Sequence, residues 1–350
     1  MKNLFYVFAF LLLAQTSIMA QDPHSSFIGI TPGPYNPAMT GSINDARTRI
    51  TIHNRHQFGP VLGPSGAYRT YSASVESYTG IDDVCSSCSE DILAFGFHAT
   101  GDWRGEIPLY RLDANLSIAY RKLLDKDMNH RKFIYLGAKA GFINHSIDFG
   151  GLTFNEQFAN PNLPPELSGG ANSLVPDFGI GLGWSYLSKD RMGKSFEAGA
   201  SMSHINTPEF SLLEESINNR YGQVINKLFT IHAQARLPIY RDKVAINPSF
   251  VFRCQDPHTQ LLLGTQMLFA LEDGYMLSVG GGCRISKGAD QPNGDAAIAS
   301  LGLLISNQLE VSFHYDAGLT IQQSVPQSLE LAIAYRFGKQ GCLDAYTPYF

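Results

Sequence analysis

The sequence of residues 177–187 is DFGIGLGWSYL, in which large apolar side chains alternate strictly with small or polar residues. In a β-strand, successive side chains point to opposite faces of the sheet. Phe178, Ile180 and Trp184 therefore share one face, and the glycines between them share the other. A run of about ten residues is long enough for a tilted strand to cross a bilayer. This stretch predicts a transmembrane β-strand.

The same alternation recurs from about residue 45 to residue 338, with turn signals between the runs. The candidate strands lie near 46–58, 67–78, 92–102, 108–123, 133–147, 175–188, 195–205, 227–238, 243–254, 259–271, 275–286, 295–306, 308–322 and 327–338. Closure of an even number of strands satisfies every backbone N–H and C=O group in lipid. We therefore expect an all-β fold, a single-chain transmembrane antiparallel β-barrel of about fourteen strands. A soluble two-sheet sandwich is the alternative, but it leaves the long aromatic stripes unexplained.

The composition excludes several classes of protein. Only 16% of the 350 residues are charged, against about 25% in soluble domains. The mean hydropathy of -0.08 is too low for a helical membrane bundle. The net charge of -5 supplies no basic surface for phosphate groups, so a nucleic-acid partner is not expected.

Four segments are predicted along the chain. Residues 1–20 resemble a secretory signal peptide, because a short positive start precedes an apolar core that is too short to span a membrane. Residues 21–44 are rich in proline and are expected to be extended, either as a plug in the lumen or as a periplasmic docking strand. Residues 45–338 form the barrel, and residues 339–350 form a periplasmic tail.

Two long gaps separate the candidate strands, at 148–174 and 206–226. Outer-membrane barrels keep their long loops outside the cell and their short turns in the periplasm. If the first strand runs outward, both gaps are extracellular. They carry the candidate cargo-contact residues Phe154, Phe158, Phe210, Leu212 and Leu213. The alternative is that the loops fold over the barrel mouth and bury these side chains.

Charged residues on the polar faces of the strands are expected to point into the lumen. The candidate lumen charges are Asp113, Arg121, Arg236, Arg253, Arg284, Glu310, Glu330 and Arg336. Their signs are mixed, whereas a pore with a fixed ion preference usually shows one dominant sign. A closed lumen with salt bridges and an open lumen both fit this pattern.

No catalytic signature is present, since the sequence contains no HExxH, Walker or GxSxG motif. Cys85 and Cys88 are interpreted as a loop disulfide or incidental thiols, with a redox or metal role as the alternative. Cys254 and Cys283 fall on strands that are second neighbours, too far apart to be bridged. The sequence predicts no enzyme, no cofactor and no metal site.

Several stretches, in order along the chain, resemble the PorP/SprF family of outer-membrane proteins of the Bacteroidetes type IX secretion and gliding machinery. They include QDP at 21–23, YNPAMTG at 35–41, TYSAS at 70–74, SIDF at 146–149 and LEL at 329–331. The positions that match family motifs are Asn36, Pro37, Tyr71, Ser72, Asp148, Phe149, Asp177, His204, Pro208, Tyr315, Asp316 and Phe350. The tail departs from the family pattern, because seven residues separate Cys342 from Phe350.

This resemblance implies a non-enzymatic outer-membrane protein that supports protein secretion and gliding motility. Its implied partners are outer-membrane lipid, a secreted adhesin or other type IX cargo, and a periplasmic ring or peptidoglycan-linked components of the machine. A passive, porin-like channel for small solutes is the alternative function. The conductance of the purified barrel would discriminate between the two.

Overall fold

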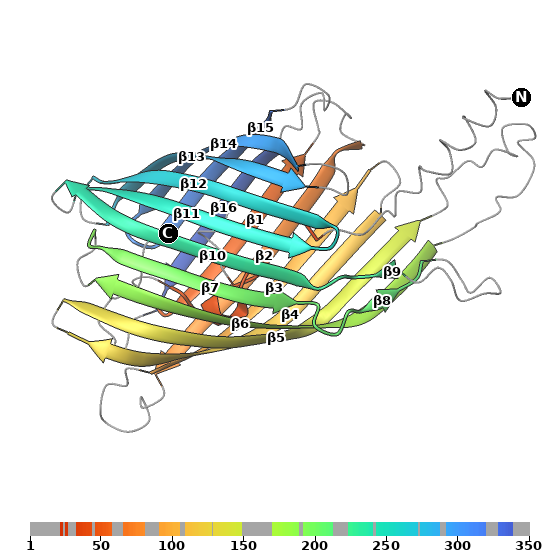
Figure 1. Ribbon diagram of the computed structural model, residues 1–350, viewed down its shortest axis with the longest axis horizontal. Helices are drawn as coiled ribbons and strands as arrows, with labels where there is room; N and C mark the ends of the chain where they lie inside the picture. Colours follow the sequence, from red (N-terminus) through yellow and green to blue (C-terminus); the bar gives the residue numbers. More distant parts are fainter. Residues whose placement is uncertain are drawn as a thin grey trace, which may run out of the picture.

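The structure is a computed structural model, in which the described residues are 22–23, 25–26, 33–43, 46–57, 66–80, 91–105, 109–127, 129–148, 170–188, 192–212, 223–240, 243–271, 274–287, 292–319 and 328–338. Within them, a 14-strand antiparallel sheet closes on itself as a barrel (Figure 1). The predicted fold is therefore confirmed. The predicted signal peptide, the whole predicted tail (339–350) and the loop cysteines Cys85 and Cys88 lie outside the described residues.

The elements follow one another as η1, a 3₁₀ turn, and then the strands. Their bounds are η1 (Pro37–Met39), β1 (Thr48–Gln57), β2 (Tyr68–Gly80), β3 (Ile92–Arg104), β4 (Leu109–Lys126), β5 (His130–Asp148), β6 (Gly170–Ser188), β7 (Ser195–Ser203), β8 (Glu209–Phe210), β9 (Gln223–Val224), β10 (Leu228–Tyr240), β11 (Val244–Gln255), β12 (His258–Ala270), β13 (Met276–Lys287), β14 (Pro292–Ile305), β15 (Leu309–Gly318) and β16 (Ser328–Phe337).

Neighbouring barrel strands are also neighbours in sequence, with two exceptions. β1 pairs with β16, with Thr48 opposite Phe337, and this pairing closes the ring. β7 pairs with β10, because β8 and β9 form a separate two-stranded sheet between them. Figure 1 shows β8 and β9 at the same end of the barrel as the start of β6. We call this the outer end, because it carries the long connections 149–169 and 204–227.

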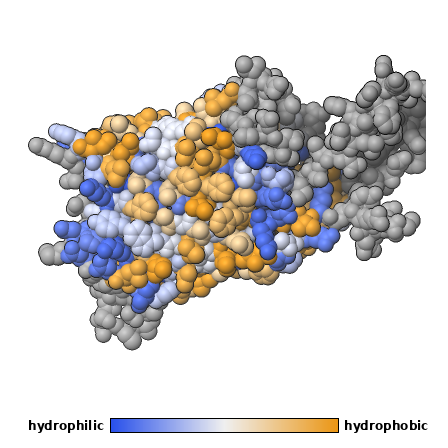
Figure 2. Space-filling view, viewed as in Figure 1, coloured by the Kyte–Doolittle hydropathy of each residue, from blue (hydrophilic) through white to orange (hydrophobic). Residues whose placement is uncertain are grey.

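The two faces of the wall differ in polarity, as the alternation predicts. Side chains that face outward are large, apolar and exposed, for example Ile180 (55%) and Leu116 (65%). Figure 2 shows apolar residues over much of the visible wall and hydrophilic residues gathered toward its two ends. The inward face is polar and buried, with Arg55, Glu197 and Glu330 almost inaccessible to solvent. No helix among the described residues is long and apolar enough to cross a membrane.

Each of the fourteen predicted strands corresponds to an observed one, but β6 differs most at its boundary. It begins at Gly170, five residues before the predicted start at 175. Proline within a strand usually indicates a loop or a sheet edge, because it has no N–H group to donate. Pro176 lies on an edge of β6 that no described strand pairs with, so it fits within the strand. The first predicted outer loop is therefore shorter than 148–174.

Candidate functional site

Residues of the chain that precede the barrel lie inside its lumen. The described part of this stretch, residues 22–23, 25–26 and 33–43, is called the lumen segment here. Asp22 contacts residues at the outer end of the wall, including Gln255 at the end of β11. Ser42 accepts a hydrogen bond from Arg49, near the start of β1 at the opposite, inner end. The lumen segment therefore extends along the lumen from its outer end to its inner end.

The outer contact is a buried cluster of charges around Asp22. One carboxylate oxygen of Asp22 lies 2.7 Å from Nη1 of Arg111, and the other lies 2.6 Å from Nε2 of His204. The second ring nitrogen of His204 lies 2.7 Å from the carboxylate of Asp177 on β6. Burial alone would raise the pKa of Asp22, but the charges of Arg111 and His204 outweigh it and hold that pKa well below its usual value.

The same cluster sets the charge of His204. Burial alone would lower the pKa of His204, but the carboxylates of Asp22 and Asp177 outweigh it and raise the pKa to about 9. The imidazole is therefore doubly protonated at neutral pH and donates to both carboxylates. This arrangement ties the lumen segment to β6 and to the chain that follows β7.

A second contact lies further along the lumen segment, at Ser26. Its backbone N–H donates to Glu330 over 3.0 Å, and its hydroxyl donates to Asp316 over 2.7 Å. Asp316 also accepts a bond from Arg284 over 2.7 Å, and Glu330 lies 3.2 Å from Nε of Arg55. These carboxylates are fully buried, so their charges are stabilised only because arginines and the lumen segment surround them.

The third contact is the 3₁₀ turn η1, which begins after Asn36. The side-chain oxygen of Asn36 accepts the N–H of Ala38 over 3.0 Å, and its amide donates to the C=O of Leu182 over 3.0 Å. The turn lies directly against glycines of the wall. A Cβ atom on Gly137 would lie 2.4 Å from the backbone N of Ala38, and one on Gly181 would lie 1.9 Å from Oδ1 of Asn36. Gly137 and Gly181, which have no side chain, therefore leave the space that η1 occupies.

Arg121 holds the end of this turn. Its Nη2 donates to the C=O groups of Met39 over 3.3 Å and Thr40 over 3.0 Å. The guanidinium also lies 4.8 Å from the ring centre of Tyr135, in a cation–π contact. Because carbonyl oxygens at the end of a helical turn carry partial negative charge, a buried arginine at this position fixes the turn in the lumen.

All eight predicted lumen charges project from the inward faces of their strands, and several of them pair across strands. Arg284 pairs with Asp316, Glu330 with Arg55 and Arg336 with Glu310. Asp113 lies 3.6 Å from Arg111, and Arg253 lies 5.6 Å from the ring centre of Tyr35 in the lumen segment. The mixed signs thus reflect pairing, which neutralises the lumen in the region of these contacts.

The prediction missed other charges that complete these networks, namely Arg49, Arg55, Glu76 and Arg111. Arg49 and Glu76 form a buried pair at 2.6 Å on β1 and β2. Arg49 and Arg55 share a strand face with Thr51 and His53, opposite Ile50 and Ile52. Applying the period-two count to residues 48–57 would have found these two arginines, despite the weak alternation of that strand.

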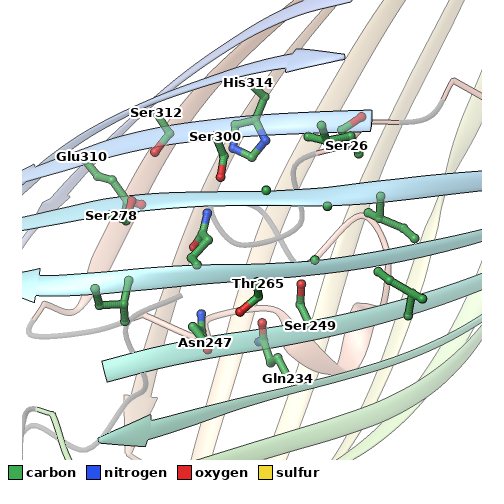
Figure 3. A pocket seen from close by; sticks show the side chains of 18 of the residues that line it. Ser26, Gln234, Asn247, Ser249, Thr265, Ser278, Ser300, Glu310, Ser312 and His314 are labelled. Carbon is green, nitrogen blue, oxygen red and sulfur yellow. The ribbon is translucent and has the colours of Figure 1, made fainter. Parts of the chain in front are cut away.

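A cavity of about 90 Å³ lies on the side of the lumen formed by β10 to β15 (Figure 3). Its polar lining consists of Ser26, Gln234, Asn247, Ser249, Thr265, Gln266, Ser278, Ser300, Glu310, Ser312 and His314. Apolar clusters lie toward its two ends, with Val251, Leu262 and Ile298 on the outer side and Ala245, Leu268, Met276 and Leu304 on the inner side. A second cavity of about 100 Å³ lies beside Tyr35 and Arg111. Both suit water or a small polar solute.

The sequence matches the family model of the type IX secretion system membrane protein PorP/SprF over residues 18–335. The chain belongs to the PorP/SprF family. The predicted membership is thus confirmed, and the protein is an outer-membrane β-barrel of a secretion-system family. No curated protein matches the PorP/SprF chain described here.

Solved outer-membrane barrels resemble this PorP/SprF protein in fold. The Pseudomonas putida toluene transporter TodX is 8% identical, with 91% of this chain and 99% of that chain covered and a TM-score of 0.47. A Pseudomonas aeruginosa FadL homologue is 10% identical, with coverage of 93% and 96% and a TM-score of 0.45. BamA from Haemophilus ducreyi, lacking POTRA domains 1–3, is 10% identical, with coverage of 84% and 70% and a TM-score of 0.42.

The PorP/SprF motif positions fall into two groups. Asn36, Pro37, Asp177, His204 and Asp316 belong to the contacts between the lumen segment and the wall. Tyr71 and Tyr315 face outward, and Ser72 bonds Thr100 on the next strand. Asp148 ends β5, and the C=O of Pro208 accepts the N–H of Ile225. Phe149 and Phe350 lie outside the described residues.

Two of the five candidate cargo-contact residues of this PorP/SprF protein, Phe210 and Leu212, lie among the described residues. Phe210 is buried, and its ring stacks on His145 with 3.9 Å between the ring centres. It packs with Ile143 and Ile225, and Leu212 is half-buried against the same cluster. Phe210 therefore folds over the barrel mouth, because burying its apolar ring there is more favourable than exposing it to water. Phe154, Phe158 and Leu213 lie outside the described residues.

The remaining predicted positions carry no recognisable metal chemistry. Cys254 and Cys283 are free thiols on β11 and β13, with β12 between them. No group of three or more His, Cys, Asp or Glu residues that could hold a metal ion occurs among the described residues. His232 and His314 are both buried, and Nε2 of His232 lies 3.0 Å from Nδ2 of Asn36.

Proposed function

We propose that this protein is a non-enzymatic component of the type IX secretion machinery that supports export or surface anchoring of adhesin-type cargo. The observation that supports this is the lumen segment, which is held at its outer end, at Ser26 and at η1 by buried polar contacts. Removing one partner of a buried ion pair typically costs about 3–5 kcal/mol. Asp22 forms such pairs with Arg111 and His204, and buried hydrogen bonds at Ser26 and η1 add to them, so the segment is a stable plug, which suits a machine component.

The proposed partners follow from the two ends of the barrel. Cargo meets the outer end, through the connections 149–169 and 204–227, where half-buried Leu212 and exposed Val224 lie. Periplasmic ring or peptidoglycan-linked components meet the inner end, through residues 81–91 and the tail 339–350. Gliding motility belongs to the same proposal, since it follows from the family resemblance.

The channel remains as a second candidate, and the polar cavity under β10 to β15 favours it. The lining consists mostly of neutral hydroxyl and amide groups, and its Glu310 is paired with Arg336, so it would pass small uncharged solutes if the lumen segment moved aside. With the segment in place, apolar residues at both ends of the cavity oppose the passage of polar solutes.

Two measurements test the proposal. In planar bilayers, the purified full-length chain is expected to show no large, stable conductance, whereas a persistent porin-like conductance would favour the channel. In cells, deletion of the gene is expected to remove at least one adhesin-type protein from the surface. Deletion of residues 155–168, which leaves β6 intact, should reproduce that loss while the barrel still assembles. Normal display of every surface protein in the gene deletion would contradict the secretion role.

A further inference from the structure

β6 is paired along its whole length on one side but only along its inner half on the other. Its ladder with β5 runs from Ser188 to Gly170. Its ladder with β7 covers only Gly179 to Tyr186, because β7 ends at Ser203, opposite Gly179. Among the described residues, no strand pairs with residues 170–178 on the β7 side. This half of β6 is an open sheet edge.

The side chain of Asn206 forms hydrogen bonds with the backbone of Phe178 and Pro176, where a neighbouring strand would otherwise bond. The N–H of Phe178 donates to Oδ1 of Asn206 over 3.3 Å, and the Asn206 amide donates to the C=O of Pro176 over 2.7 Å. The C=O of Phe178 accepts the N–H of Ile205. Because backbone groups alternate in direction along a strand, those of Leu174 and Asn172 point toward the same edge.

Beyond Asn206, the described chain up to residue 212 forms no strand pair with residues 170–178, and its short strand β8 pairs with β9 instead. Phe210 turns into the barrel mouth and packs on the inward-facing residues His145 and Val175. Pro176 also suits an open edge, because its missing N–H removes no ladder bond there. Leu174 and Asn172 therefore present N–H and C=O groups at positions where a further strand would bind.

The open edge lies at the outer rim of the wall, because β6 begins at Gly170, directly after the long connection 149–169. Asn172 is opposite Ser146, which is opposite Tyr110, and Tyr110 contacts Trp103 in the kind of aromatic belt that marks the interface. An unpaired edge in hydrocarbon would leave backbone groups unsatisfied at a cost of several kcal/mol each, whereas water satisfies them at the surface. The side chain of Leu174, beside the unpaired backbone groups, is 64% exposed, so a chain that bound at the edge could cover it.

We propose that residues 170–174 of β6 bind an extended segment of a secreted polypeptide by β-strand addition, with an apolar side chain of that segment covering Leu174. Alternating N–H and C=O groups on an edge are recognised by another backbone, which is why a peptide strand is the fitting ligand. The bonds from Asn206 show that this edge already accepts a strand-like partner where the ladder with β7 stops. The inference rests on the proposed secretion role and names where its cargo docks.

Hydrogen exchange of the purified full-length barrel in micelles tests whether the edge is open. The amides of Asn172 and Leu174 are expected to exchange rapidly, while those of Ser173 and Val175, which point toward β5, exchange slowly. Slow exchange at all four amides would overturn the proposal, because it would mean that another part of this chain already occupies the edge.

Photo-crosslinking in cells tests the ligand. A crosslinking amino acid at position 172 is expected to capture a secreted protein through an extended segment, and Leu174→Pro, which removes one edge N–H, should reduce that adduct at least tenfold. Leu174→Thr keeps the N–H and should retain most of it, and a probe at the lipid-facing position 116 should give none. A homotypic adduct, or no adduct, overturns the inference. If no adduct forms but the gene deletion still abolishes surface display, the docking edge fails while the secretion role stands.

Discussion

The charge of His204 holds the lumen segment in position, because the protonated imidazole bonds Asp22 of that segment. It lies between Asp22 and Asp177, and these carboxylates raise its pKa from 6.5 to about 9. A raised pKa in the folded state stabilises the fold fully below the unfolded value and loses this effect as the pH rises through the folded value. The contact is therefore expected to contribute fully at pH 6, to weaken as the pH rises above about 6.5, and to contribute little beyond about pH 9.

The pH prediction can be checked with His204→Gln. The free energy of unfolding of the wild type should exceed that of the variant most at about pH 6, and the difference should shrink between about pH 7 and pH 9. Asp22 behaves in the opposite sense, because its lowered pKa makes its contribution disappear only as the pH falls below about 4. A difference between the proteins that does not change from pH 6 to 10 would count against a protonated His204.

Gly137 gives a second prediction at the scale of one residue. A Cβ atom there would lie 2.4–2.5 Å from backbone atoms of Pro37 and Ala38, so Gly137→Ala should displace η1 while the wall still closes. We expect brief conductance openings in planar bilayers, which the wild type lacks. Gly264→Ala is the matched control, since its Cβ would meet only the Ser249 hydroxyl at 3.0 Å and ordinary contacts beyond it. Identical traces for all three proteins would show that η1 does not close the lumen.

At the scale of elements, the open edge of β6 is expected to tolerate proline at positions whose N–H points away from β5. Asn172→Pro removes an N–H on the open edge, whereas Ser173→Pro removes one that bonds β5. The first variant should assemble into a barrel whose gel mobility shifts on boiling, as for the wild type. The second should assemble poorly, because it removes a ladder hydrogen bond to β5 in a position where a sheet does not tolerate proline. Equal assembly of both variants would mean that β6 is not an edge at this position.

The elements were largely predictable because each lipid-facing strand must alternate in polarity. Residues such as Ile180 and Leu182 have no other way to face lipid while Gly179 and Gly181 face the lumen. Pro176 misled the prediction of where β6 starts, since its meaning depends on whether a neighbour pairs with that side of the strand. Pairing between distant strands is a tertiary property that local alternation does not encode.

The contents of the lumen were less predictable than its wall. The period of two places Arg284 and Glu330 inside, but it does not say which carboxylate each arginine meets. The lumen segment carries no alternation, and its partners are far away in sequence, as Asn36 and His232 illustrate. Plug and docking strand were therefore equally compatible with the sequence of residues 21–44.

At the scale of the whole molecule, the loop lengths assign the outer end of the barrel to the cell surface. Glu209 and Asp127 are exposed residues at opposite ends. In intact cells, a membrane-impermeant maleimide should label Glu209→Cys strongly and Asp127→Cys no more than the wild type with its native cysteines. Both variants should be labelled after lysis. The reverse pattern in intact cells would invert the orientation.

The path of the lumen segment also constrains the order in which the barrel can be built. The segment precedes β1 directly and lies inside a ring that β1 and β16 close. Threading residues 22–43 through a finished ring would require the buried arginines and carboxylates to lose their partners along the way. The β1–β16 seam is therefore expected to close last, around a leading segment already in position, so the first residues act as an internal template for the wall that encloses them.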